Sequence, residues 1–188
     1  MKEWRQQQRQ RLLDERAGLQ SAERENIQHR CLQHLTDCLH DVEPGILGLY
    51  WPIRGELDCR GLAQSLMTDG WKLALPSINP ETRKLDFAHW QPGMAMTTGI
   101  WNIPVPAQLD ILRPRYFLIP LVGFDSSNYR LGYGGGYYDR TLAAIKDSVV
   151  TIGVGMEMGR VASSYPHCFD IPMHKVVTEA GIQTVDNF

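Results

Sequence analysis

The apolar run YFLIPLVGF at residues 116–124 limits what this chain can fold into more than any other segment. A nearly continuous apolar run of this length, bounded by polar residues, is typical of a strand that is buried on both faces. Shorter apolar runs at 46–50, 71–75 and 149–155 predict further buried strands, and residues 176–178 predict a last short one. A sheet made of such strands needs helices on both sides, which the same chain must supply.

Helical patterns lie between these runs. Residues 2–17 are rich in Arg and Gln and predict a polar helix. Ser21 is the expected N-cap of a second helix, whose apolar residues recur every four positions and form one buried stripe: Ile27, Cys31, Leu35 and Leu39. Further helices are predicted over 62–67 and 137–146. Strand, helix and strand in this order form crossover units, so we expect an α/β fold with a mainly parallel sheet and helices on both faces.

Residues 76–115 depart from this pattern, because six prolines interrupt them. Within this stretch only LDFAHW, at 85–90, resembles a strand. We interpret the stretch as an elaborated connection, which is a natural place for the wall of a substrate site.

Length and composition narrow the classes of function. A chain of 188 residues fits one domain, 1–188, with a sizeable core. A net charge of −2 argues against a general nucleic-acid binder, and no apolar run approaches the ~20 residues that span a bilayer. The start MKEWRQQQRQR lacks the apolar segment of a signal peptide, and the four cysteines have no CxxC spacing, as in reduced proteins. We therefore expect a cytoplasmic protein that binds neither nucleic acid nor membranes.

The segment RLGYGGGYYDR, at 130–140, places four glycines within five positions between a predicted buried strand and a predicted helix. This is the carboxyl edge of the sheet, where open α/β folds bind ligands, and glycines there let backbone N–H groups approach a phosphate. The segment is neither a P-loop, since no lysine follows the glycines, nor a GxGxxG fingerprint, since Tyr137 takes the third glycine position. A glycine-rich turn without a ligand is the alternative.

Asp139 and Arg130 flank these glycines and favour a ligand. A carboxylate beside a phosphate requires a cation between them, and Mg²⁺ takes one or two protein carboxylates together with phosphate oxygens. Arg130 can clamp a phosphate. The alternatives are an acid that interacts only with the helix dipole and an arginine exposed to solvent. Together the two residues predict a site for a nucleotide with Mg²⁺.

These residues carry a resemblance to a known family. RLGYGGGYYDR, preceded by LIPLVGFD and followed by TLA, resembles the signature of the 5-formyltetrahydrofolate cyclo-ligases, also called methenyltetrahydrofolate synthetases. YWPIRGELDCRGL, GIWNIPVP and FDIPMHKVVTE are similar to other segments of that family. The resemblance implies an enzyme that uses ATP and Mg²⁺ to convert 5-formyltetrahydrofolate to 5,10-methenyltetrahydrofolate, releasing ADP and phosphate. It also implies a three-layer α/β/α sandwich similar to the NagB, RpiA and CoA-transferase group.

The resemblance also implies roles for individual residues. Asp139 and Asp170 would face the magnesium ion, and Glu56 would bind the folate. An N-terminal basic residue would reach ATP, and the spacing leaves open which one of three: Lys2, Arg5 or Arg9. Nine consecutive residues would cradle the ATP phosphates, with the first and last of them taking part in catalysis: Arg130, Leu131, Gly132, Tyr133, Gly134, Gly135, Gly136, Tyr137 and Tyr138.

Three further positions bear on the second substrate and the metal. Trp101 would line the pterin pocket, and its place in a proline-bounded loop suits stacking on a flat heterocycle. Glu56 in GELD has the hydrogen-bonding capacity for pterin N–H groups, although a helix-capping acid is an equal reading of its position alone. The chain has His174 where the family often has a second acid after Asp170. This difference weakens the case for a metal contact near Asp170 but not for one at Asp139.

The chemistry accounts for these residue types. A formyl carbon on nitrogen is a poor electrophile, and phosphorylation of its oxygen by ATP would activate it toward attack by N10 of the pterin. Such a reaction needs Mg²⁺ and backbone donors at the phosphates, not a protein nucleophile. The alternatives are an ATP-dependent relative that acts on another small carbonyl or amide, and a folate-binding protein without turnover. We expect a monomer.

Overall fold

A computed structural model, in which residues 1–185 are described, has an eight-stranded sheet at its centre. The strands follow the spatial order β12 (Gly181–Thr184), β11 (Lys175–Thr178), β10 (Val150–Val154), β7 (Tyr116–Pro120), β1 (Ile46–Gly48), β2 (Lys72–Asn79), β3 (Lys84–His89) and β6 (Ile111–Leu112). The run from β11 to β2 is parallel, whereas β12, β3 and β6 are antiparallel to their neighbours. The predicted mainly parallel sheet is confirmed.

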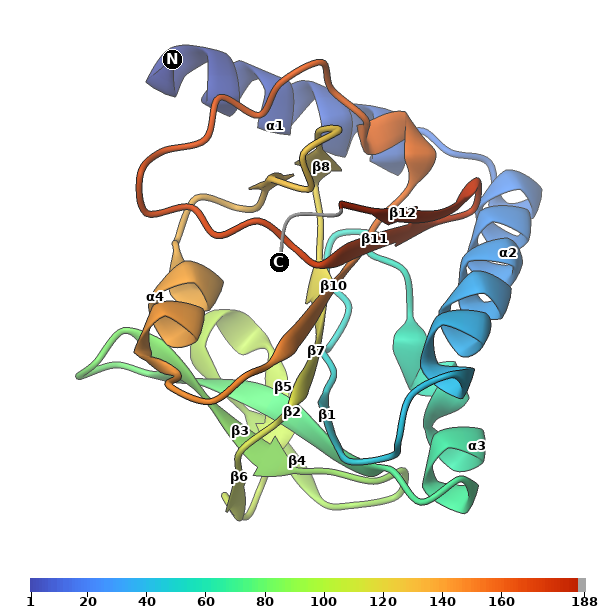
Figure 1. Cartoon of the computed structure of the whole chain (residues 1–188), viewed down its shortest axis with the longest axis vertical. Coiled ribbons are helices and arrows are strands. Elements are labelled where there is room, and N and C mark those ends of the chain that lie inside the picture. The colour runs from blue at the N-terminus through green and yellow to red at the C-terminus, as the bar shows by residue number, and fades with distance from the viewer. Residues whose placement is uncertain (186–188) are drawn as a thin grey trace.

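The side chains of the central strands alternate between two apolar cores. In β7, Leu118 faces the core beneath α2 (Ser21–His40) and α3 (Ala63–Thr68). Its neighbours Phe117 and Ile119 face the other core, with Leu142 of α4 (Tyr137–Ala144). Figure 1 shows α2 and α3 on one side of the sheet and α4 on the other. The predicted three-layer α/β/α arrangement is therefore confirmed, although α4 makes its layer thin.

Helix α1 (Lys2–Ala17) belongs to neither layer and lies across the end of the sheet where the parallel strands finish (Figure 1). Leu12 packs there against Val122 and Leu131, and the buried Arg16 donates from Nη2 to the carbonyl of Leu121 at 2.5 Å. A polar helix is thus placed over the loops that leave the carboxyl ends of the strands. This edge is where open α/β folds bind ligands.

The second helix and the run 116–124 each depart from their prediction in one detail. Gln20 rather than Ser21 is the N-cap of α2 and gives no side-chain cap, whereas the predicted apolar stripe of α2 is buried. The run 116–124 leaves the sheet after Pro120, and its end forms the short hairpin of β8 (Gly123–Phe124) with β9 (Arg130–Leu131). Gly123 permits α1 to pack closely on this hairpin, because a Cβ there would lie 2.8 Å from Leu12 of that helix.

The connection 76–115 is more regular than predicted. It contains the antiparallel strands β3 and β6 and a separate pair, β4 (Met96–Thr98) with β5 (Pro104–Pro106). Pro76 lies inside β2, at a point beyond the pairing with β1, so its missing N–H interrupts no ladder on that side. Three short 3-10 helices complete the structure: η1 (Cys59–Leu62), η2 (Ile100–Asn102) and η3 (Glu157–Gly159). Within residues 1–185, no helix has both the length and the apolar character needed to cross a membrane.

Candidate active site

The glycine loop, residues 132–136, leaves β9 and enters α4 at the carboxyl end of the sheet. The hairpin before it is held by buried Asp125, which accepts from the N–H groups of Ser127, Tyr129 and Ser164. Gly134 and Gly136 have φ values of +91° and +65°, which disfavour residues with a side chain. The loop therefore exposes backbone where other residues would place side chains, which is the geometry that a phosphate cradle requires.

Gly135 needs to be glycine for a different reason, which is contact. A Cβ there would lie 2.7 Å from Cε2 of Tyr137 and 3.9 Å from the ring of Trp101. Leu131, by contrast, is fully buried against α1, and its carbonyl accepts from the N–H of Val122 at 2.9 Å. Of the predicted cradle, Leu131 thus anchors the loop to the core, and the glycines form its open part.

Two of the three candidate N-terminal cations contact the site loops. Arg9 donates from Nε to the carbonyl of Gly132 at 2.6 Å and lies beside Gly134. Burial, and next the nearby Arg5, lower the pKa of Arg9, so its guanidinium lies where an anion would be stabilised. Arg5 pairs with Asp170 at 2.6 Å. Lys2 is different, because it lines a cavity together with Arg9, Arg54 and Tyr133 rather than bonding to a site loop.

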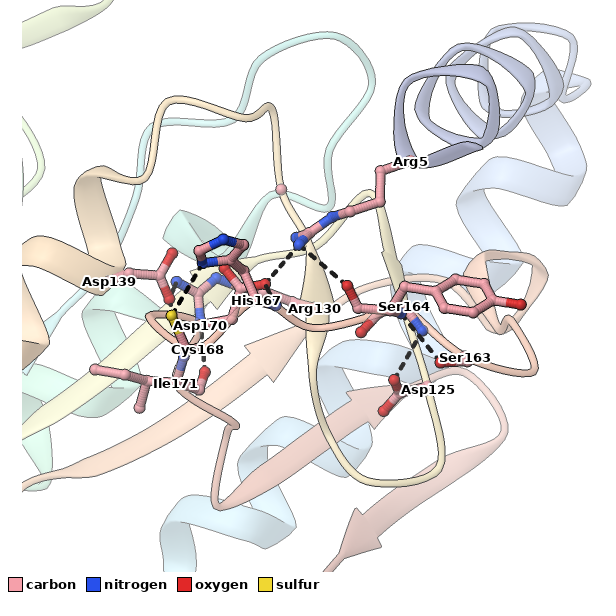
Figure 2. Close-up of polar contacts among 12 residues, drawn as sticks. Arg5, Asp125, Arg130, Asp139, Ser163, Ser164, His167, Cys168, Asp170 and Ile171 are labelled. Carbon is pink, nitrogen blue, oxygen red and sulfur yellow. Dashed lines mark hydrogen bonds and ion pairs between the residues drawn. The ribbon is translucent and has the colours of Figure 1, made fainter. Parts of the chain in front are cut away.

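Arg130 and Asp139 are paired with each other. Arg130 is buried, and its Nη2 lies 2.7 Å from Oδ1 of Asp139, while its Nη1 donates to the carbonyl of Ile171 at 3.0 Å. The same Asp139 oxygen accepts from the N–H of Ile171 at 3.1 Å. Figure 2 shows this arrangement beside the loop that carries Asp170. The sequence predicted a phosphate clamp and a metal ligand, and the structure adds a direct bond between the two.

Asp139 and Asp170 have the chemistry to hold a magnesium ion. Asp170 uses Oδ2 to accept from Arg5 and from the N–H of His167, and Asp139 uses Oδ1 for its contacts, so each carboxylate keeps a second oxygen. No group of three or more His, Cys, Asp or Glu suited to a metal occurs in the described part of the chain. A bound Mg²⁺ would therefore need phosphate oxygens to complete its shell, as its preferences allow.

His174 contacts β10. Its Nδ1 lies 3.1 Å from the N–H nitrogen of Thr151 and 2.8 Å from the hydroxyl of the same residue. Burial lowers the pKa of His174, which is consistent with a neutral ring that accepts from the Thr151 N–H. This histidine therefore fixes the start of β11 to β10.

Glu56 has an unpartnered oxygen next to the glycine loop. Its Oε2 accepts from the N–H of Ile53 at 2.9 Å, whereas Oε1 is buried and has no partner within residues 1–185. Burial raises the pKa of Glu56 to about 7, opposed by the Ile53 N–H, by the Tyr133 hydroxyl and by Arg16. The hydroxyl of Tyr138 is likewise buried without a partner in the described chain, and its pKa is raised first by burial and then by Glu56. Two unpartnered groups this close together are suited to a polar ligand.

Trp101 lies against the glycine loop from a distant part of the chain. Its ring makes an edge contact with Tyr137, with centroids 5.4 Å apart, and the residue is 64% exposed. Trp101 and Asn102 both have φ of +58°, an unfavourable backbone conformation that is concentrated at functional sites. An exposed indole held in this way offers a flat surface to a planar ligand, and its role at the pterin stays a prediction.

Arg140 is a site residue that the sequence reasoning missed. It donates from Nη2 to the carbonyl of Gly135 at 2.7 Å and from Nε to the carbonyl of Arg83 at 2.8 Å, and it lies over the Tyr137 ring. It thereby fixes the glycine loop from within α4. Its position as the last residue of RLGYGGGYYDR was the available signal.

Arg54 was also missed, and no sequence pattern marks it. Its guanidinium lies 5.5 Å from the centre of the Tyr133 ring, in the loop that carries Glu56. Its backbone has a positive φ of 47°, which is uncommon for a residue other than glycine.

The fold and the site together define a class: an α/β/α protein with a glycine-rich anion cradle at the carboxyl ends of its parallel strands. Comparison with known proteins makes this specific, because the profile of the 5-formyltetrahydrofolate cyclo-ligase family matches residues 1–179. The chain belongs to this family.

Individual relatives agree with the family assignment. A 5-formyltetrahydrofolate cyclo-ligase of Haemophilus influenzae is 29% identical over 185 residues, covering 92% of this chain and 96% of the relative. One of Escherichia coli (strain K12) is 30% identical over 135 residues, covering 68% and 74%. Among solved structures, a 5,10-methenyltetrahydrofolate synthetase of Aquifex aeolicus aligns with a TM-score of 0.83 at 25% identity, covering 98% of this chain and 94% of that one. A synthetase of Mycoplasma pneumoniae has the same fold, with a TM-score of 0.78 at 23% identity and coverage of 93% and 98%.

Proposed function

We propose that the protein uses ATP to cyclise 5-formyltetrahydrofolate to 5,10-methenyltetrahydrofolate, releasing ADP and phosphate. Its membership of the cyclo-ligase family supports this reaction. The structural observation that supports this reaction is the unpartnered carboxyl oxygen of Glu56, which is buried beside a glycine loop that can hold phosphates. One edge of the sheet thus has a place for each of the two substrates.

The phosphoryl donor is held by the glycine loop and by Arg9. The backbone at 134–136, together with the guanidinium of Arg9, stabilises negative charge on the terminal phosphates. Asp139 and Asp170 would hold Mg²⁺, which supplies charge neutralisation at the phosphates when it is bound. Arg130 keeps Asp139 in place through their ion pair, so its role in catalysis is to position that carboxylate.

The second substrate is held by Glu56 and its surroundings. N–H groups of the pterin would donate to Oε1 of Glu56, and Tyr138 offers its hydroxyl nearby. With a pKa of about 7, Glu56 is partly protonated near neutral pH, and donors from a ligand favour its charged form. Trp101 and Tyr137 would form the flat wall of the pocket.

The reaction then balances without a protein nucleophile. The formyl oxygen takes the terminal phosphoryl group of ATP, and the bond from that group to ADP breaks. The lone pair of N10 forms a bond to the formyl carbon, N10 loses its proton, and the carbon–oxygen bond to phosphate breaks. The products are the methenyl bridge, ADP and phosphate, and the protein contributes positioning and charge stabilisation.

The direct test is to mix the purified protein with ATP, Mg²⁺ and 5-formyltetrahydrofolate. Absorbance of methenyltetrahydrofolate should appear together with an equal amount of ADP. ADP without methenyltetrahydrofolate would favour a relative that acts on another carbonyl, and folate binding without either product would favour a non-catalytic folate-binding protein. We further propose that residues 1–188 form a single domain that acts as a cytoplasmic monomer without nucleic acid or membrane partners, to be checked by its mass in solution.

A further inference from the structure

Arg16, near the end of α1, is a buried cation with one unused donor group. The residue is only 3% exposed. Its Nη2 donates to the carbonyl of Leu121 at 2.5 Å, whereas its Nη1 is buried and has no partner within residues 1–185. No carboxylate in the same part of the chain forms an ion pair with it. A buried donor left unpaired in this way is destabilising and indicates that a ligand supplies its partner.

Two other unpartnered buried atoms belong to the same region, namely Oε1 of Glu56 and the hydroxyl of Tyr138. The positive charge of Arg16 acts on Glu56, where it opposes the burial that raises the pKa of the carboxyl group. It acts in the same way on Tyr133, whose pKa is raised first by burial and then by Glu56. Arg16 and Glu56 therefore face one pocket, yet in the described chain they do not pair with each other.

Arg24 of α2 fixes the spacing between these two residues. It donates from Nη2 to the carbonyl of Arg16 at 2.6 Å and from Nη1 to the carbonyl of Gly55 at 3.0 Å. One side chain thus joins the end of α1 to the loop that carries Glu56. The space between Arg16 and Glu56 is set before a ligand arrives, and preorganisation of this kind lowers the entropic cost of binding.

This space is suited to a ligand edge on which a donor stands next to an acceptor. Oε1 of Glu56 needs a donor, and Nη1 of Arg16 needs an acceptor. The charges of Arg16 and ionised Glu56 cancel, so the edge between them should be neutral. The pyrimidinone ring of a folate has such an edge, because its N3–H group lies directly beside the carbonyl group at C4.

We propose that Arg16 donates from Nη1 to the C4 carbonyl of the pterin while Glu56 accepts from N3–H, which makes Arg16 a specificity-determining residue for 4-oxo pterins. The inference rests on the proposed function and deepens it. A 4-amino pterin would present a donor to the guanidinium, so that two buried donors would face each other without an acceptor. The C4 carbonyl is also next to the N5 position that carries the formyl group, so the same bond orients the reacting side of the ring.

Calorimetry in the absence of ATP tests this by measuring the dissociation constants of 5-formyltetrahydrofolate and of its 4-amino analogue. Arg16→Met removes the cation but keeps an unbranched side chain. Arg16→Lys keeps the cation, with a single donor group in place of two. The control is Arg24→Gln, which weakens the link between α1 and the Glu56 loop but keeps Arg16.

Arg16→Met should weaken binding of the 4-oxo compound at least tenfold, equivalent to ~1.4 kcal/mol, and should leave binding of the 4-amino compound equal or tighter. Arg16→Lys should weaken binding of the 4-oxo compound about threefold, and the same comparison of the two compounds decides the question if Arg16→Met does not fold. Arg24→Gln should change both affinities by the same factor.

Equal losses for the two compounds in the Arg16 variants would overturn the inference, as would an unchanged affinity for the 4-oxo compound. A selective loss in Arg24→Gln would also overturn it, because loosening the loop would then be sufficient. If wild type binds neither compound, the folate site and the inference both fail. A selective loss in a protein that shows no turnover would support the inference and refute the proposed reaction alone.

Discussion

Replacing Glu56 by Gln should make the protein more stable and less active at the same time. The carboxyl group is buried, and its pKa of about 7 lies well above the ordinary 4.5. Between these two pH values the folded chain holds a proton that the unfolded chain has released, so the free energy of unfolding falls as the pH rises. Above pH 7 the full penalty is present, because both states are ionised and only the folded one buries the charge.

The size of this penalty follows from the pKa. At about 1.36 kcal/mol for each pH unit, the difference amounts to roughly 3 kcal/mol. Glutamine does not ionise, so Glu56→Gln should be more stable than wild type at pH 8, by about 1–3 kcal/mol once an imperfectly bonded buried amide is allowed for. The advantage should disappear near pH 4, where the wild-type carboxyl is protonated in both states.

Urea denaturation of both proteins at pH 4.5 and pH 8 measures this difference directly. In parallel, calorimetry should show ATP affinity within about twofold of wild type but folate affinity reduced by tenfold or more, since charge-assisted hydrogen bonds contribute about 1.5–3 kcal/mol each. A variant no more stable at pH 8 than wild type would refute the buried charge. Equal weakening of ATP and folate would refute the separate folate role, and so would an unchanged folate affinity.

Three other substitutions test the phosphate side. Asp139→Asn should remove most of the Mg²⁺ dependence of ATP binding while keeping a partner for Arg130. Calorimetry measures the ATP affinity with and without Mg²⁺, and affinities equal to those of wild type would exclude Asp139 as a metal ligand. Gly135→Ala should lower kcat at least tenfold, because the new Cβ would lie 2.7 Å from Tyr137. Gly61→Ala, whose Cβ would make only a 3.9 Å contact, serves as the control. Equal kcat values for the two variants would contradict the phosphate cradle. Arg140→Gln should raise the KM for ATP about fivefold, because the hydrogen bond to the Gly135 carbonyl is lost, while the melting temperature should change little. An unaltered KM would show that this hydrogen bond does not hold the loop.

The centre of the fold could be predicted because its strands are short apolar runs buried on both faces. The edges could not, because β3, β6 and β12 owe their places to pairing with neighbours rather than to periodicity. Pro76 is an example: a proline normally argues against a strand, and only the register shows that its missing N–H faces no partner in β1.

Parts of the candidate site could likewise be predicted from the sequence, and other parts could not. The glycine loop and Asp139 could be found because they are contiguous in sequence. The pair of Arg130 with Asp139 also depends on Ile171, and the contact of Trp101 with Tyr137 joins distant segments, so both exist only through the fold. The partial protonation of Glu56 could not be predicted either, because burial is its cause and burial is a property of the assembled structure.

Helix α1 has a consequence for the motions of the enzyme. It carries Arg9 and Arg5 to partners 123 and 165 residues away, yet only Leu12 and Arg16 of its sixteen residues are buried. A segment with so few buried contacts opens at a small fraction of the free energy needed to unfold the sheet. We therefore expect the helix to detach locally and uncover the phosphate side of the site, and we expect bound ATP to oppose this detachment. Amide hydrogen exchange in residues 2–17 would then register occupancy of the site, while exchange in β7 and β10 would register only global unfolding.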